Sequence, residues 1–326
     1  MTTSTGSYKS PPLINRVVAL LSNIYLISMV GYLILRLIFT DTTWWLAFLN
    51  AFAFYTFLPV FILLPLTFLL RIWKSVGRLS ILALLGIIWF GPFFQPAHSL
   101  PSRGGTTLKI VTFNLWGSNN TDIDGTTEWL NDSEADIIVI QEPHPAIVNN
   151  LDYPEHIETN GLHLFSNYPV IESSQVDNQQ RVVLDVNGQQ IALYHIHFAY
   201  PLDRPPRFDL PLLNVISRYD ETERNRQLEA LLDYLKEEPL PYIVAGDFNM
   251  SQHSMVYSDL ALVMSDSFRT TNSGLGVTWS TQTAFPMLRL DYIWHERTIR
   301  ALKTEIGPVL GSDHLPMIAW LELPNE

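Results

Sequence analysis

The stretch that decides the fold is Tyr-Ile-Val-Ala-Gly-Asp-Phe-Asn, residues 242–249. Its first five residues are apolar, aromatic or small, and the adjacent isoleucine and valine favour a buried strand over 242–246. The polar side chains of Asp247 and Asn249 follow directly, where this strand ends. Loops that leave strand ends often carry functional side chains, so this junction is the first candidate for a site.

The segment before this strand, 220–238, is the clearest helix of the chain. Asp220 suits the N-cap with Glu223 three residues on, leucines recur on one face, and Pro239 ends the pattern. Further strands are predicted at 108–114, 136–141, 181–186, 190–197, 288–294 and 317–323. Many strands with two or three helices in mixed order predict an α/β fold, a layered sandwich of two sheets.

Several predicted strands carry, within them or next to one end, a polar residue that is suited to catalysis or metal binding. These residues are Asn114, Glu142, His197, Asp291, Asp313 and His314. Each has an ordinary explanation by itself, as a turn former, a cap or a structural side chain. Asp291 is the hardest to explain in that way, because Leu290 and Tyr292 flank it in a strand and a buried carboxylate needs a partner. Their recurrence predicts one site at a sheet edge.

Six short segments carry these residues in order along the chain. They are Thr112-Phe113-Asn114-Leu115-Trp116, Ile140-Gln141-Glu142, His197-Phe198, Gly246-Asp247-Phe248-Asn249, Arg289-Leu290-Asp291-Tyr292 and Gly311-Ser312-Asp313-His314-Leu315-Pro316. Together they resemble the endonuclease/exonuclease/phosphatase superfamily, the group with deoxyribonuclease I-like folds. The resemblance implies a four-layer α/β/β/α sandwich over residues 106–326.

The resemblance also implies a hydrolase that cleaves a phosphoester with the help of a divalent cation. Glu142 and Asp313 are the implied metal ligands, with Asn114 beside them in contact with metal or phosphate. Mg²⁺ is the expected ion, because it is hard and prefers oxygen ligands. Mn²⁺ and Ca²⁺ are the alternatives.

The implied catalytic residues are His197, Asp247, Asn249, Asp291 and His314. In this interpretation Asp247 activates water, Asn249 holds that water or a phosphate oxygen, and His314 donates to a non-bridging oxygen. Asp291 orients His314 and raises its pKa. His197 is a second phosphate donor or the acid for the leaving group.

One histidine assignment stays open. The superfamily usually has Thr-His-Leu at this point, whereas residues 194–198 read Tyr-His-Ile-His-Phe. His197 fits better, since an apolar residue follows it at the strand end. His195 is the alternative, because strand alternation points it to the same face.

Arginines in and after the Pro-rich segment 201–218 are candidates for substrate binding. Arg204, Arg207 and Arg218 are expected there, since the guanidinium fork suits phosphate groups, and a solvated charged loop is the competing interpretation. Arg224 and Arg226, at the start of the helix, are expected to form surface salt bridges with nearby glutamates.

Three long apolar runs fill the first third of the chain. They predict transmembrane helices at about 17–39, 43–70 and 79–97, because about 20 apolar residues span a bilayer. Residues 1–98 are then a membrane anchor, and 99–105 are a short linker.

The distribution of basic residues predicts the orientation. Lys9 and Arg16 precede the first run, and Arg71, Lys74 and Arg78 lie between the second and the third. The positive-inside rule places these segments in the cytoplasm. With three spans, the C-terminal domain lies outside the cell (plasma) membrane.

The charge balance bears on the substrate. Residues 1–98 carry six Lys or Arg and one acid, and the remainder carries 14 Lys or Arg against 31 acids, a net of −17. This acidity argues against a protein that holds long nucleic acid by counterion release. The chain has no cysteine, which excludes disulfides, zinc thiolate sites and cysteine nucleophiles.

The expected function is hydrolysis of a phosphodiester or phosphomonoester outside the membrane, with a lipid headgroup or nucleic acid as candidate substrates. A nuclease that degrades extracellular DNA or RNA is the first alternative. A non-catalytic membrane binding module is the second.

Overall fold

The structure is a computed structural model, and it describes residues 12–97, 99–202, 205, 214, 217–283 and 287–324. It divides into two compact units, Met1–Pro92 and Phe93–Glu326. The division lies a few residues before the predicted end of the anchor at residue 98.

The N-terminal unit is built from apolar helices. They are α1 (Leu13–Phe39), α2 (Trp44–Ala51), α3 (Ala53–Leu69) and α4 (Trp73–Phe90), with the 3-10 turn η1 (Gly91–Phe94) after them. Leu13–Phe39 and Trp73–Phe94 are each long and apolar enough to cross a membrane. The pair α2 and α3, bent by 63°, makes a third if it is one span.

The run predicted to span at 43–70 is helical, but it forms two helices because the chain bends after Ala51. A buried polar group lies beside the break. The Asn50 side chain donates to the carbonyl of Thr40 and to the carboxylate of Asp41, and it accepts from Tyr32 of α1. These bonds hold the end of α2 near the end of α1 and satisfy an amide that is fully buried.

The C-terminal unit contains two six-stranded sheets. The first has the order β11 (Arg300–Ile306), β12 (Met317–Glu322), β1 (Thr107–Asn114), β2 (Ile137–Gln141), β4 (Leu162–Ser166) and β3 (Glu155–Thr159). The second has the order β5 (Val170–Val176), β6 (Gln179–Val186), β7 (Gln189–His197), β8 (Tyr242–Asp247), β10 (Asp291–His295) and β9 (Ser265–Asp266).

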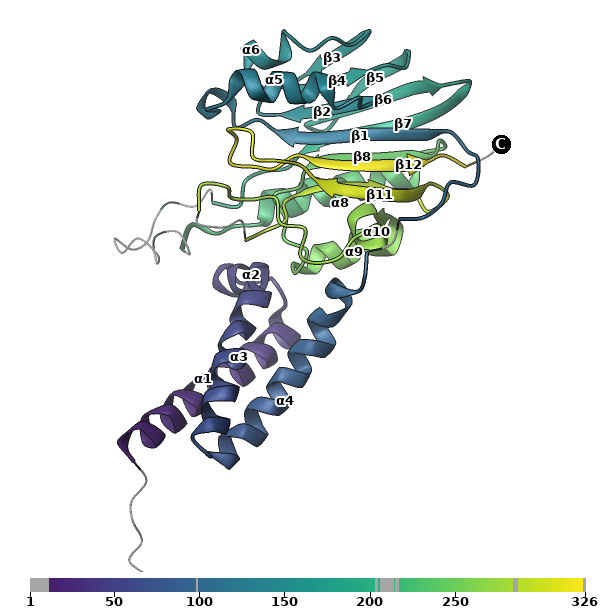
Figure 1. Ribbon diagram of the computed structural model, residues 1–326. Coiled ribbons are helices and arrows are strands. Elements are labelled where there is room, and N and C mark those ends of the chain that lie inside the picture. The colour runs from purple at the N-terminus through teal and green to yellow at the C-terminus, as the bar shows by residue number, and fades with distance from the viewer. Residues whose placement is uncertain are drawn as a thin grey trace, which may run out of the picture. The chain divides into compact units, whose positions relative to one another are not determined.

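The two sheets stack face to face and carry helices on their outer faces (Figure 1). Alternate side chains such as Ile110, Val139 and Ile243 form the core between the sheets. A second core packs α5 (Ile123–Asp132) and α6 (Pro145–Val148) on the first sheet. A third packs α8 (Thr222–Lys236) and α9 (Met255–Val263) on the second. The predicted α/β/β/α sandwich is confirmed.

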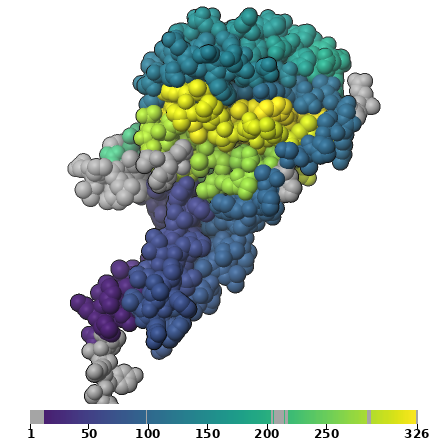
Figure 2. Space-filling view, viewed as in Figure 1, coloured from purple at the N-terminus to yellow at the C-terminus, as the bar shows by residue number. Residues whose placement is uncertain are grey.

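The strand register explains how distant segments meet. β12 pairs with β1, so the yellow C-terminal strands of Figure 2 lie in the middle of the domain's surface. β1 runs parallel to β2 and β7 runs parallel to β8, and the ends of these strands carry the polar residues. The helix predicted at 220–238 is α8, which begins two residues later than expected, after Glu221.

Candidate active site

The strand ends bring the predicted site residues together by register. His197 at the end of β7 pairs with Asp247 at the end of β8, and Asp247 lies directly opposite Asp291 at the start of β10. In the other sheet, Asn114 ends β1 beside Gln141, and Glu142 follows. All these positions lie at one edge of the sandwich.

Gly246 is required by the close approach of β7 and β8. Its φ is +150°, and a Cβ atom there would lie 1.9 Å from the carbonyl oxygen of Ile196. No larger residue fits without moving the backbone. The glycine thus sets Asp247 in its position against His197.

A loop tied to β1 delivers Asp313 and His314 to the same edge. The Ser312 hydroxyl donates to the Asn114 carbonyl at 2.6 Å and accepts from the His314 amide at 3.1 Å. His314 Nδ1 then lies 2.8 Å from Asp291 Oδ2, and His314 Nε2 lies 3.8 Å from Asp247 Oδ2.

Burial alone would lower the pKa of His314, but the carboxylates of Asp291 and Asp247 outweigh it and raise the pKa to about 10. His314 is therefore an imidazolium at neutral pH, with Nδ1 donating to Asp291. The predicted pairing of Asp291 with His314 is present in the geometry.

Asp247 is almost fully buried at the centre of the site. Its carboxylate accepts from the Asn249 amide at 2.8 Å and from the Asn114 side chain at 3.1 Å. Burial raises its pKa to about 6, with His314 opposing and Asp291 assisting the rise. Asp247 is thus a base whose pKa lies closer to neutrality than that of an ordinary carboxylate.

Two further carboxylates face this centre. Glu142 accepts from the Asn114 amide nitrogen at 3.1 Å, and Asp313 Oδ2 accepts from Trp279 Nε1 at 3.0 Å. Asp313 Oδ1 is buried and has no hydrogen-bond partner among the residues that the structure describes. Burial raises the pKa of Asp313, and the nearby charge of Glu142 contributes to the rise. Such a pair of oxygen donors suits a hard cation.

The groups of Asp247, Asp291 and His314 also lie within 4.8 Å of one another, a spacing compatible with a metal ion. His314 Nδ1 already donates to Asp291, however, and a protonated ring has no lone pair for a metal. We therefore interpret this cluster as a network of charged hydrogen bonds, and Glu142 with Asp313 as the better cation donors.

His195 and His197 lie in different environments although they share a face of β7. His195 is fully buried between the sheets, where it contacts the amides of Gln141 at 2.8 Å and Gln180 at 3.2 Å. His197 lines the pocket, with Nε2 3.6 Å from Glu142 and 3.8 Å from Asp247. His197 is the one of the two that a substrate can reach.

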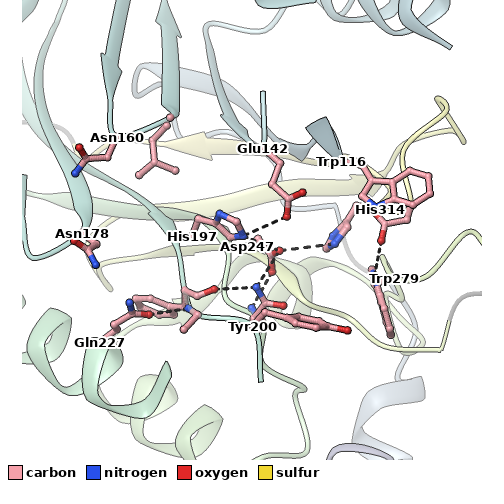
Figure 3. A pocket seen from close by; sticks show the side chains of 16 residues that line it. Trp116, Glu142, Asn160, Asn178, His197, Tyr200, Gln227, Asp247, Trp279 and His314 are labelled. Carbon is pink, nitrogen blue, oxygen red and sulfur yellow. Dashed lines mark hydrogen bonds and ion pairs between the residues drawn. The ribbon is translucent and has the colours of Figure 1, made fainter. Parts of the chain in front are cut away.

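The pocket at this edge has a volume of about 830 Å³. In Figure 3, His197, Asp247 and His314 lie at its centre, Trp116 and Trp279 at one end, and Asn160 and Asn178 at the other. The tryptophans flank motif residues, and the two asparagines come from turns that were not predicted to belong to the site.

Arg224 was expected at the surface, and that prediction is wrong. Its side chain is 1% exposed, pairs with Glu221 at 3.0 Å and donates to the carbonyl of Asn249 at 3.1 Å. Asn249 has a positive φ of 47°, so this bond supports an unusual backbone conformation next to the site. Arg226 does lie at the surface, paired with Glu223 and Asp177.

The arginines predicted to bind substrate are only partly covered. Arg204 and Arg207 lie outside the described residues. Arg218 is partly buried and donates to the Leu202 carbonyl at 2.9 Å, and it is not among the residues that line the pocket. A substrate-binding role for these arginines stays a prediction.

Comparisons with known proteins agree with this fold. No curated protein sequence matches the chain. Two solved structures from Bacteroides, described as endonuclease/exonuclease/phosphatase proteins, are similar in fold. The one from B. thetaiotaomicron shows 15% identity over 68% of this chain and 99% of its own, with a TM-score of 0.55. The one from B. vulgatus shows 19% identity over 67% and 99%, with a TM-score of 0.53.

A third similar structure is a humanized D. rerio TDP2 carrying 14 mutations. It shows 19% identity over 66% of this chain and 99% of its own, with a TM-score of 0.52. The family model that matches residues 111–314, more than half of the chain, is described as the endonuclease/exonuclease/phosphatase family. Its match begins within β1 and ends at His314, so it spans every predicted site residue. The chain belongs to the endonuclease/exonuclease/phosphatase family.

Proposed function

We propose that the protein is a divalent-metal-dependent phosphoesterase that cleaves a phosphodiester or a phosphomonoester at the edge of its sandwich. The observation that supports this most is the arrangement of Asp247, His314 and Asp291 opposite the carboxylates of Glu142 and Asp313. Family membership supports hydrolysis of a phosphoester bond.

Glu142 and Asp313 would hold the cation. The unpartnered Asp313 Oδ1 and the 42% exposed side chain of Glu142 leave oxygen atoms available for it. Mg²⁺ fits this donor set, and when bound it offsets negative charge on the phosphoryl oxygens. Asn114 bridges Glu142 and Asp247 through its amide nitrogen, so it fixes the spacing between the cation donors and the base.

Asp247 would take a proton from the attacking water as its oxygen forms the new bond to phosphorus. Asn249 lines the pocket beside Asp247, and its amide nitrogen donates to the carbonyl of Phe198 at 2.9 Å. This bond orients its side-chain oxygen, which would then accept a hydrogen bond from the attacking water. The base is positioned before the substrate arrives, which lowers the entropic cost of reaching the transition state.

His314, held as an imidazolium by Asp291, would donate to a non-bridging phosphate oxygen and stabilise the charge that develops there. The bond from phosphorus to the leaving oxygen breaks as the new bond forms. His197, 3.8 Å from Asp247, would donate a proton to that oxygen.

The experiment is hydrolysis of bis(p-nitrophenyl) phosphate by the purified full-length chain in detergent. Turnover is expected with Mg²⁺ and is expected to stop with a chelator. Asp313→Asn should raise the Mg²⁺ concentration needed for half-maximal activity, because one oxygen donor is lost. The exposed Asp132→Asn is the matched control and should behave as wild type. Equal turnover with and without chelator would overturn metal dependence.

We also propose that the catalytic domain faces outward from the cell membrane. This orientation requires α2 and α3 to count as one bent span, which makes three crossings with α1 and α4. The basic residues before α1 and around the α3–α4 connection then lie in the cytoplasm.

The cysteine-free chain allows a direct test of this orientation. Ser173→Cys, on the exposed side of β5, introduces the chain's first thiol. A membrane-impermeant maleimide is expected to label it in intact cells, with unlabelled wild type as control. Labelling only after permeabilisation would place the domain inside and overturn the three-span topology.

A further inference from the structure

Two hairpin turns form one end of the pocket, which we call the amide end because Asn160 and Asn178 line it. Asn160 and Gly161 join β3 to β4, and Asp177 and Asn178 join β5 to β6. The two hairpins belong to different sheets, yet both turns border the pocket. Asn160, Asn178 and, below them, Gln227 of α8 lie at the same end of the pocket in Figure 3.

The two asparagines have free hydrogen-bonding capacity. Both are exposed, and neither side chain has a hydrogen-bond partner among the residues that the structure describes. Gln227 is buried, and its oxygen accepts from the Ala199 amide at 2.7 Å, which orients its amide nitrogen. Carboxamides both donate and accept, as hydroxyl groups do.

The charge of the pocket restricts what accompanies the reacting phosphate. Its lining includes the carboxylates of Glu142, Asp247 and Asp313, and no lysine or arginine occurs among the lining residues that the structure describes. A bound cation offsets the reacting phosphate. No lysine or arginine among the described lining residues is available to offset a second phosphate within the Debye length of about 8 Å.

We propose that Asn160, Asn178 and Gln227 form a subsite for an uncharged, hydroxyl-bearing substituent of the phosphoester, of the glycerol type. This inference rests on the proposed phosphoesterase function and narrows its substrate class. The substrate is then a phosphodiester that carries a polyol group on the reacting phosphate.

Diesters that carry the same kind of group on both sides of phosphorus give the sharpest test, because either side can then occupy the amide end of the pocket. The full-length enzyme is assayed with Mg²⁺ on diglyceryl phosphate, bis(p-nitrophenyl) phosphate and the dinucleotide dTpT. The three diesters have leaving groups of different reactivity. For each enzyme, the kcat/KM of a diester is therefore divided by the kcat/KM of bis(p-nitrophenyl) phosphate. This ratio is then compared between the variant and wild type.

The variant is the double substitution Asn160→Gly with Asn178→Ala. Asn160 has a φ of +52°, so glycine removes the side chain without backbone strain, whereas Asn178 has no such constraint. The glyceryl ratio is expected to fall on the order of 10-fold, as two hydrogen bonds are lost. The matched control is Gln190→Ala, an exposed amide at the opposite end of β7 from His197, and its ratio should not change.

The outcomes separate the inference from the function beneath it. An unchanged glyceryl ratio in the double variant would overturn the subsite, and so would a larger fall for dTpT than for diglyceryl phosphate. If wild type cleaves none of the three diesters, phosphodiester hydrolysis fails as the proposed function and the subsite fails with it.

The glycerol group has two sources, a water-soluble glycerophosphodiester and a phospholipid headgroup. Micelles of phosphatidylglycerol and of phosphatidylcholine form the second arm of the test. Cleavage of phosphatidylglycerol above phosphatidylcholine, lost in the double variant, assigns the lipid source. Cleavage of diglyceryl phosphate alone assigns the soluble one. A preference for phosphatidylcholine would overturn an uncharged headgroup.

Discussion

The interior of the sandwich and its open edge both contain polar side chains, but they use them in opposite ways. The interior set is Thr112, Gln141, Gln180 and His195, all fully buried and linked to one another by hydrogen bonds. The edge set is Glu142, His197, Asp247, Asp291, Asp313 and His314.

The two sets differ in their charge and in whether their polar atoms have hydrogen-bond partners. The interior set is neutral, since burial holds the pKa of His195 well below its usual range. The edge set contains a charged ring, since the carboxylates of Asp291 and Asp247 outweigh burial and raise the pKa of His314 to about 10. One oxygen each of Asp291 and Asp313 has no hydrogen-bond partner within the described ranges. The two sets meet on β7, where His195 belongs to the interior set and His197, two residues later, belongs to the edge set. Paired neutral groups serve the fold, whereas unpaired charges are available for a ligand.

The largest effect is expected at the centre of the edge set. Asp247→Asn should lower turnover of bis(p-nitrophenyl) phosphate by about 10²- to 10⁴-fold, because a proton acceptor is lost. The thermal unfolding midpoint should stay within a few degrees, since the new amide still accepts from the Asn249 backbone. A variant that unfolds instead would show that Asp247 serves the fold as the interior set does.

Asp291→Asn tests whether the edge charges act together. Turnover should fall by about 10²-fold with the fold intact, because His314 loses the carboxylate that raises its pKa. The histidine ring resonances should report a lower pKa for His314. Unchanged turnover would remove Asp291 from the mechanism.

His195→Leu tests the interior set from the other side. The free energy of unfolding should fall by about 1–3 kcal/mol, because Gln141 and Gln180 lose a buried partner. Turnover of a generic diester should change less than threefold. A loss of turnover like that of Asp291→Asn would show that the interior set does more than stabilise the fold.

The smallest effect is a pH dependence of stability that His195 contributes. Burial lowers its pKa in the folded state, while the unfolded chain binds the proton near pH 6.5. The stability that depends on neutral His195 is therefore present above pH 6.5 and is lost as the pH falls below that value. The difference in unfolding free energy between wild type and His195→Leu should shrink between pH 7.5 and 5.5. Parallel curves would contradict it.

Most of the edge set was predictable because strand ends and short motifs are local signals. Gly246, for example, indicates a close contact between two strands, and Asp247 after it indicates a functional side chain. The burial of Arg224 was also predictable, since it lies four residues before Leu228 and seven before Leu231 on the buried face of α8. The prediction of a surface position was wrong because charged side chains are seldom buried, whereas the helical spacing places Arg224 on the buried face.

Two other features of the structure could not be predicted from the sequence alone. Asn160 has a sufficient local reason to occupy its turn, and only the stacking of two sheets brings that turn to the pocket of Asp247. The break after Ala51 depends on bonds from Asn50 to residues at the end of α1. An apolar run of that length looks the same whether its helix is straight or bent.

The two turns at the amide end have a consequence for how such an enzyme diversifies. Residues 160–161 and 177–178 lie outside the paired positions of both hairpins, so a replacement that tolerates the positive φ of Asn160, Gly161 and Asp177 leaves the register of the sheets unchanged. Hydrolytic chemistry is held by strand ends, and selectivity is held by replaceable turns. A substitution at Asn178, whose φ is not positive, can therefore change the preferred substrate while the strand ladders keep the catalytic side chains in place.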